Sequence, residues 1–349
     1  MKDTPLTSLH RRLGAGMGAD SGWNMPLQYT NLIDEHLSTR SACGIFDISD
    51  TGKFRIRGNG ALECLEGLLS NTIADCRDGN TQQSLLLRGD GMILDRITLC
   101  RESAGSFFII GSASQTQADY ESLRRDVRHG ALELVNETDA LCGIALLGPD
   151  AARILSRVHF AAELPRRGEF CRFKRGGQRC LLTRAGLVSE DSLELFCPAA
   201  SGIAWFEQLM AAGAVPCGLR TREILRLERG RADMGKDAAS LTPTAAGLTH
   251  LCSTEKEYTG SDILQSTPET EGKLVALHGT TPGHEFSPGD SVHDPNGRHI
   301  GNITSAAASP AGGQSYAIAY VSSEHSAPGT HVWVQTDGCS VPAQVKAQS

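Results

Sequence analysis

The chain changes its residue pattern near position 267, and this change limits the folds that it can adopt. Before that point, segments with helical spacing, such as 61–69, mix with short apolar strands, such as 141–147. These segments follow no regular strand–helix–strand rhythm, which favours an α+β fold over a doubly wound parallel sheet. After that point, short strands are separated by Gly, Pro, Asp and Asn. We therefore predict an α+β region over residues 1–265 and a separate β-barrel or jelly-roll domain over residues 272–349.

A helix and a loop are predicted within residues 21–52. Asn31 is a candidate N-cap for the helix, and the residues after it form an apolar stripe at helical spacing, namely Leu32, Ile33, His36 and Leu37. Residues 23–29 read Trp-Asn-Met-Pro-Leu-Gln-Tyr, which predicts a loop rich in bulky and amide side chains. Such a loop either lines a ligand site or packs in the core, and the residues alone favour neither.

The charge and the cysteines narrow the class of protein. The chain has 33 basic and 40 acidic residues, and its net charge of −7 argues against a broad surface for nucleic acid or anionic membranes. The sequence shows no apolar leader and no apolar run of membrane-spanning length, so we expect a cytoplasmic protein. The 11 cysteines include no Cys-x-x-Cys pair, which favours free thiols in a reducing compartment. We expect no metal site.

Several short motifs follow one another along nearly the whole chain. Residues 22–29 read GWNMPLQY, residues 216–219 read PCGL, and residues 225–228 read LRLE. Further along, residues 242–248 read TPTAAGL and residues 301–310 read GNITSAAASP. In this order the motifs resemble those of the glycine cleavage T protein (aminomethyltransferase) family. The resemblance implies a three-lobed fold, with two intertwined α+β lobes, a C-terminal barrel and tetrahydrofolate in a central region.

The resemblance also implies two residues that hold folate. Glu190, in the run RAGLVSED at 184–191, stands where the family has a glutamate that grips the pterin. One carboxylate can accept the adjacent donors of a reduced pterin as a bidentate pair. Arg222 matches a family arginine, and a cation there suits the glutamate tail of folate. Without the resemblance, a surface glutamate and a helix arginine paired with a carboxylate would be the simpler interpretation.

Other positions depart from the family pattern. Thr72 follows Asn71 where the family has its catalytic aspartate, and a neutral hydroxyl cannot replace that charge. A carboxylate is gained at Asp50, where the family reads Ser-His-Met-Gly, so Asp50 is the best substitute acid. Gln83 and Met234 stand where the family has tyrosines. We therefore predict a catalytic pair and four folate-contacting residues, namely Thr72 and Asp50, and Glu190, Arg222, Gln83 and Met234.

The function implied by the resemblance is tetrahydrofolate-dependent aminomethyl transfer. The donor would be an aminomethyl group on the lipoyl arm of H-protein, and ammonia would leave. The changed pocket keeps two alternatives open: a folate-dependent transferase or demethylase with another one-carbon donor, and a folate-binding protein without catalysis. The family's iron–sulfur repair branch is disfavoured because residues 255–262 lack its signature cysteine. We expect a monomer that binds neither nucleic acid nor membrane. The basic run at 172–175 is interpreted as a solvated face, with contact to an acidic carrier as the alternative.

Overall fold

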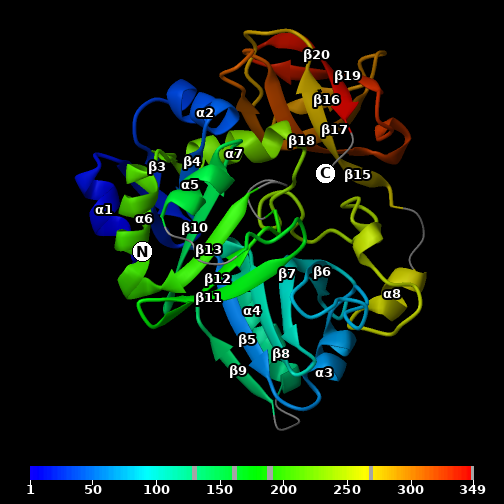
Figure 1. Cartoon of the computed structure of the whole chain (residues 1–349). Coiled ribbons are helices and arrows are strands. Elements are labelled where there is room, and N and C mark those ends of the chain that lie inside the picture. The colour runs from blue at the N-terminus through cyan, green and yellow to red at the C-terminus, as the bar shows by residue number, and fades with distance from the viewer. Residues whose placement is uncertain (128–131, 159–162, 187–191, 267–269, 347–349) are drawn as a thin grey trace. The chain divides into compact units, whose positions relative to one another are not determined.

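The computed structural model describes residues 1–127, 132–158, 163–186, 192–266 and 270–346 (Figure 1). The chain divides into two compact units. The first unit comprises residues 1–86 and 95–222, and the second comprises residues 87–94 and 223–349. Each unit is described by itself below.

The first unit opens with a small sheet instead of the predicted loop. Its strands run in the order β1-β3-β2, with α1 (Thr7–Arg12) in between in sequence, and their bounds are Lys2–Asp3, Trp23–Gln28 and Gly16–Asp20. The loop prediction for residues 23–29 is therefore wrong. Trp23 and Met25 are buried in β3. Burial of consecutive residues in β3 hides the alternation that marks a strand, and pairing with β1 and β2 holds the segment extended.

Helix α2 (Leu32–Ser41) begins as predicted but buries a different face. The Asn31 side chain accepts a hydrogen bond from the Asp34 backbone N–H at 2.9 Å, which confirms the N-cap. The expected apolar stripe is not the buried face, since Ile33 and Leu37 are exposed and Glu35 is buried. Burial of Glu35 is stabilised because its carboxylate accepts hydrogen bonds from four donors, namely the backbone N–H groups of Tyr29, Thr30 and Gly218 and the Thr221 hydroxyl.

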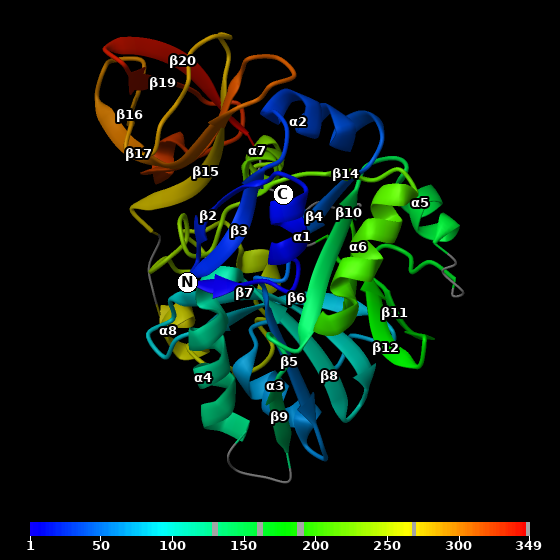
Figure 2. The same ribbon diagram turned by 90° about the vertical axis from the view of Figure 1, so that its left-hand side faces the viewer.

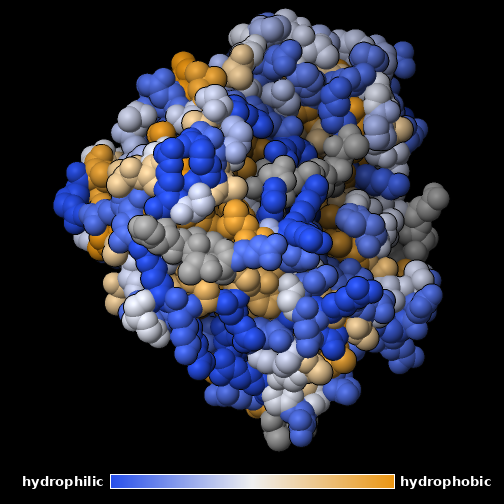
Figure 3. Space-filling view, in the orientation of Figure 1, coloured by the Kyte–Doolittle hydropathy of each residue, from blue (hydrophilic) through white to orange (hydrophobic). Residues whose placement is uncertain are grey.

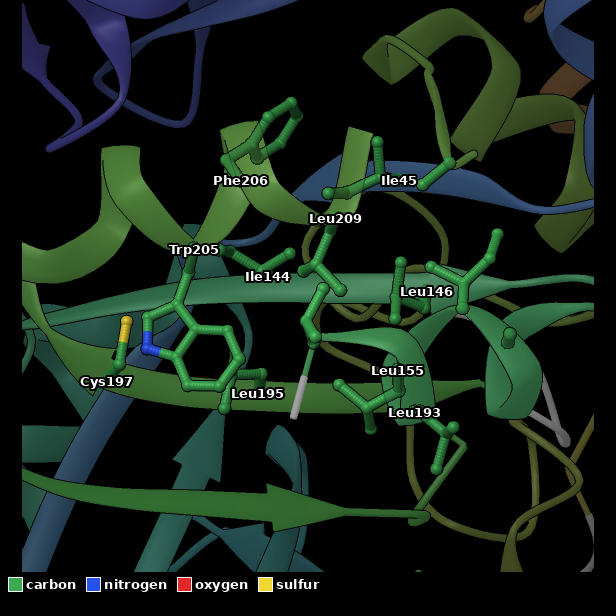
Figure 4. Close-up of a cluster of buried hydrophobic side chains, with 14 of the residues drawn as sticks. Ile45, Ile144, Leu146, Leu155, Leu193, Leu195, Cys197, Trp205, Phe206 and Leu209 are labelled. Carbon is green, nitrogen blue, oxygen red and sulfur yellow. The ribbon is translucent and has the colours of Figure 1, made fainter. Parts of the chain in front are cut away.

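A six-stranded sheet holds the main core of the first unit. Its order is β11-β12-β13-β10-β4-β14, with bounds Phe170–Arg175, Gln178–Thr183, Leu193–Pro198, Leu141–Leu147, Gly44–Asp47 and Val215–Pro216. Helices α5 (Ala151–Arg157) and α6 (Gly202–Ala211) contribute to the same apolar cluster. Figures 1 and 2 both show α6 along β10. Figure 4 shows the α6 side chains Trp205 and Leu209 among residues of β10 and β13.

A second sheet of five strands completes the first unit. Its order is β6-β7-β8-β5-β9, with bounds Thr81–Leu87, Ile93–Ser103, Ser106–Gly111, Gly52–Arg57 and Glu133–Asn136. Helix α3 (Ala61–Leu68) precedes β6, and α4 (Thr116–Val127) contacts β5 and β9. Phe46 lies in β4, whereas Phe54 and Ile56 lie in β5, and these two consecutive strands belong to different sheets. The turn between them, residues 48–51, carries Asp50.

The second unit contains a closed barrel. After α7 (Leu219–Glu228) and α8 (Ser261–Ser266), six strands close in the order β15-β18-β17-β16-β19-β20, with bounds Gly272–Gly279, Ser315–Ser322, His299–Ala308, Ser291–His293, His331–Thr336 and Cys339–Lys346. Gly301 of β17 passes so close to the Tyr320 carbonyl that a Cβ would clash with it. Short 3-10 turns lie at Ala113–Gln115, Ala199–Ser201, Thr249–Leu251 and Ser323–His325. Mixed helices and mainly antiparallel sheets, followed by this barrel, confirm the predicted α+β fold class.

Candidate functional site

Asp50 and Arg222, two of the predicted site residues, form an ion pair. Asp50 lies in the turn between β4 and β5 and is fully buried, whereas the Arg222 side chain reaches it from α7 and is 23% exposed. One guanidinium nitrogen, Nη2, lies 3.0 Å from Oδ2 of Asp50, and Nη1 lies 3.5 Å from Oδ1. The contact joins positions 172 residues apart in the sequence. A bidentate pair of this kind fixes the orientation of the carboxylate.

Lys53 stabilises the same turn through hydrogen bonds to its backbone, and the sequence analysis did not identify this residue. Its Nζ donates hydrogen bonds to the carbonyl oxygens of Ser49 at 2.9 Å and Thr51 at 2.6 Å, which flank Asp50. Burial lowers the pKa of Lys53 to about 8, although the Asp50 carboxylate opposes this shift. The available signal was a lysine three residues after an unexpected aspartate.

Thr72 and Gln83 come together beside Asn71, at the point where the chain leaves α3 and later enters β6. The Asn71 amide accepts from the Thr72 backbone N–H at 2.9 Å and donates to the Gln83 carbonyl at 3.0 Å. The neighbouring Gln82 side chain donates to the Thr72 carbonyl at 3.0 Å. The Oε1 atom of Gln82 is buried and has no hydrogen-bond partner among the residues that the structure describes. A buried acceptor without a donor at this place suits a ligand that carries N–H groups.

Glu190 lies outside the described residues, so its role stays a prediction. Glu194, a buried residue of β13, hydrogen-bonds described residues on either side of Glu190 in the sequence. The Glu194 carboxylate accepts from the Thr183 hydroxyl and the Ala185 N–H, both at 3.3 Å, and from the Ser192 hydroxyl. A glutamate inside the apolar run Leu-Glu-Leu-Phe was the signal for it.

Met234 belongs to the second unit, where it is 4% exposed. It lies in a turn that Asp237 organises. The Asp237 carboxylate accepts from the Asp233 N–H at 2.7 Å and pairs with Arg226 at 3.0 Å. It also accepts from the hydroxyls of Thr304 and Ser305, each at 2.6 Å. The GNITS motif thus contributes two hydroxyls that fix the turn carrying Met234.

A buried network of three side chains lies next to the turn that carries Asp50, and sequence reasoning did not identify it. His10 Nε2 lies 2.9 Å from Oδ2 of Asp47, and the Tyr29 hydroxyl lies 2.7 Å from His10 Nδ1. Burial raises the pKa of Asp47, but hydrogen bonds from His10, Ser49 and Thr4 outweigh it and hold the pKa below its usual value. The pKa of Tyr29 is raised, mainly because the side chain is buried and next because the Asp47 carboxylate is negatively charged. The network stabilises the end of β4, which leads into the turn.

No helix in the described ranges is both long and apolar enough to cross a bilayer. Within the same residues, no three His, Cys, Asp or Glu side chains are grouped as metal ligands would be.

Comparison with known proteins shows the family. Residues 6–256 match the model of the GCVT N-terminal domain, and residues 273–349 match that of the glycine cleavage T-protein C-terminal barrel domain. An aminomethyltransferase of Streptomyces avermitilis is 34% identical over 99% of this chain and 96% of its own length. An aminomethyltransferase of Geobacillus kaustophilus is 31% identical over 99% of this chain and 97% of its own length.

A solved structure agrees with these matches. The crystal structure of the glycine cleavage system aminomethyltransferase T from Bartonella henselae has a TM-score of 0.91 and 28% identity, and the match covers 99% of this chain and 97% of that one. The resemblance inferred from the motifs is therefore confirmed. The chain belongs to the glycine cleavage T-protein family of aminomethyltransferases.

Proposed function

We propose that this protein transfers a one-carbon unit from a lipoyl-bound aminomethyl group to tetrahydrofolate, with ammonia as the second product. Aminomethyltransferases of this family use tetrahydrofolate as the one-carbon acceptor. The observation that carries the proposal is the buried Asp50–Arg222 pair, because it joins two predicted site residues in a chain that matches the family from end to end. We further propose a lipoylated H-protein as the partner, and a monomer that acts in the cytoplasm.

The residues present fit a reduced folate. When bound, tetrahydrofolate supplies the nitrogen atoms that accept the carbon. In the proposal, Glu190 accepts the paired donors of the pterin edge. The unpaired buried Oε1 of Gln82, beside Thr72, is a further acceptor for such donors. Arg222 has five N–H groups and is partly exposed, so it can pair with Asp50 and still meet a tail carboxylate.

Asp50 is proposed to supply the negative charge that Thr72 lacks. The transferred carbon loses its bonds to sulfur and nitrogen, so positive charge develops around it, and a fixed carboxylate stabilises that charge. Because Arg222 binds both oxygens of Asp50, we assign Asp50 an electrostatic role and not the transfer of a proton. Thr72 can donate or accept one hydrogen bond but carries no charge. This arrangement predicts turnover that is slow compared with members that keep the aspartate.

Calorimetric titration with tetrahydrofolate tests the binding half of the proposal. Glu190→Gln should weaken binding by about 1.5–3 kcal/mol, the contribution of a hydrogen bond to a charged group. Glu63→Gln on the exposed side of α3 is the matched control and should bind like the wild type. A folded Glu190→Gln protein with unchanged affinity would remove Glu190 from the site. A folded wild type that does not bind tetrahydrofolate would refute the whole proposal.

Turnover with aminomethyl-loaded H-protein tests the catalytic half, and ammonia release is the measurement. Asp50→Asn should lower the rate by on the order of a hundredfold. Ammonia release that survives Asp50→Asn would refute the role of Asp50.

The changed pocket, with Thr72, Gln83 and Met234 in place of an aspartate and two tyrosines, favours a second candidate with another one-carbon donor. Folate-dependent turnover of an N-methyl amine, without reaction of the loaded H-protein, would select that candidate. Folate binding with no turnover of either donor would select a non-catalytic folate-binding protein.

A further inference from the structure

A cavity of about 680 Å³ lies in the first unit, lined by residues of both of its large sheets. We call it the basic cavity. Its wall comes from β5, β7 and β8 of one sheet and from β10, β11, β12 and β13 of the other. The volume falls in the range of small-molecule sites, about 300–1,000 Å³. Of the predicted site residues that the structure describes, namely Asp50, Thr72, Gln83, Arg222 and Met234, none lines the basic cavity.

The lining of the basic cavity is positive in a protein that is negative as a whole. It contains five cationic and two anionic side chains, a surplus of three positive charges against a net charge of −7 for the chain. The cations are Arg55, Arg57, Arg172, Lys174 and Arg179, and the acids are Glu102 and Glu137. Figure 3 shows hydrophilic side chains gathered over β11 and β5 on this face.

The strand register places like charges side by side. Arg172 and Lys174 are two residues apart on β11, so they share one face of the strand. Lys174 stands directly opposite Arg179 of β12 in the antiparallel pair. Like charges in that position repel each other and destabilise a sheet. On the other sheet, Arg55 and Arg57 are likewise two residues apart on β5.

The acids of the cavity are already paired. Arg55 binds Glu137 through Nε at 2.9 Å and Nη2 at 3.0 Å, and it also pairs with Glu102. Arg172 lies 3.4 Å from Glu102. In contrast, three cations form no ion pair with any residue in the described part of the chain, namely Arg57, Lys174 and Arg179. These three side chains therefore offer positive charge that no ion pair within the described residues neutralises.

The floor of the basic cavity is apolar and aromatic. Phe108 and Phe196 meet edge to face with ring centroids 5.7 Å apart, and the Arg55 guanidinium lies 4.8 Å above the Phe108 ring. Leu181 and Pro198 extend the apolar surface. A site with an apolar floor and a few charged groups at one end orients a ligand that has the same two parts.

We propose that the basic cavity binds an organic anion that has a flat apolar body and a terminal carboxylate, phosphate or sulfonate. The body packs on Phe108 and Phe196, and the anionic group lies between Lys174 and Arg179, where it relieves their repulsion. The site is independent of the proposed aminomethyl transfer.

A pair of dyes tests the proposal directly. The probe is 8-anilinonaphthalene-1-sulfonate, and the control dye is N-phenyl-1-naphthylamine, which has the same aromatic body without the sulfonate. In fluorescence titrations of the full chain, we expect Lys174→Gln with Arg179→Gln to weaken the sulfonate dye about tenfold and to leave the neutral dye unchanged. Arg124→Gln, on the exposed side of α4, is the matched control and should change neither dye. Equal binding of the sulfonate dye to the double variant and the wild type would overturn the proposal.

Two further measurements separate the sources of the anion and guard against a misfolded variant. Competition with 2-naphthoate and with 1-naphthyl phosphate distinguishes a carboxylate ligand from a phosphate ligand, and displacement by neither compound overturns the proposal. At low salt and without ligand, the double variant should unfold at a higher temperature than the wild type, because the repulsion is gone. A lower unfolding temperature would show that the two cations do not repel, and it would contradict the basis of the proposal.

Discussion

The Asp50–Arg222 pair can be dissected by a double-mutant cycle of Asp50→Asn and Arg222→Gln. Arg222→Gln leaves a fully buried carboxylate without its main partner, which should destabilise the first unit by about 3 kcal/mol. We take the lower end of the range for such pairs because Lys53 still lies nearby. Asp50→Asn leaves a guanidinium that is 23% exposed and can be hydrated, so it should cost about 1–2 kcal/mol.

The double variant should lose less than the sum of the two single losses, with a coupling of about 2 kcal/mol. Urea unfolding measures each free energy. Because a chain with two units need not unfold in one step, the first unit should be followed by the fluorescence of Trp23 and Trp205 in a Trp333→Phe background.

A second cycle with Arg220→Gln is the control. Arg220 precedes Arg222 by two residues on α7, and its guanidinium meets the Gln28 side chain at 3.3 Å instead of a carboxylate. The loss of unfolding free energy caused by Arg220→Gln should add to that caused by Asp50→Asn. If the Asp50 and Arg222 effects also add to within about 0.5 kcal/mol, the buried ion pair is not formed in solution and the site as described is wrong.

The other predictions concern Lys53, Glu35, Thr72 and the domain boundary. The pKa of Lys53 is about 8 in the folded protein and 10.5 ordinarily, so the unfolded chain binds more protons between these two pH values. Raising the pH from 8 to 10.5 should therefore stabilise the wild type relative to Lys53→Met by about 3 kcal/mol, measured by urea unfolding. The same pH dependence of the unfolding free energy in both proteins would contradict this. Glu35→Gln should cost about 2–3 kcal/mol, because it removes a buried acceptor charge from four donors, and an unchanged urea midpoint would contradict the burial. Thr72→Asp should not raise ammonia release if Asp50 already supplies the charge, and a rise of tenfold or more would show that it does not. Limited proteolysis should cut between residues 265 and 273, and cleavage only elsewhere would count against the predicted boundary.

The fold class was predictable because its signals are local. The Asn31 cap lies within three residues of its partner, and the barrel strands are set off by turn residues. The face of α2 that is buried was not predictable in the same way. Hydropathy favoured Ile33 and Leu37, but Glu35 is the buried residue, and two of its four hydrogen-bond donors, Gly218 and Thr221, lie more than 180 residues away. No window of sequence contains both halves of that arrangement.

The candidate site shows the same division between local and remote information. Position in the motifs was enough to select Asp50 and Arg222, and the structure places them in contact. Lys53 and Glu194 were missed, since both are charged residues inside largely buried strands. Their burial depends on partners that the turn or the next strand supplies, such as the Thr51 carbonyl for Lys53. A buried charge therefore gives a weak sequence signal unless its partners are already known.

The exchange of an aspartate for Thr72 together with a gained Asp50 does not conserve the electrostatics of the site. The Thr72 backbone is hydrogen-bonded to the uncharged side chains of Asn71 and Gln82. Asp50 instead stands between Arg222 and Lys53, so its negative charge is largely balanced before any donor binds. A balanced charge stabilises a developing cation less than a free one at the same distance. On the proposed roles of Asp50 and Thr72, we therefore expect a reaction that is slower than that of members with the aspartate, or a donor that needs less stabilisation.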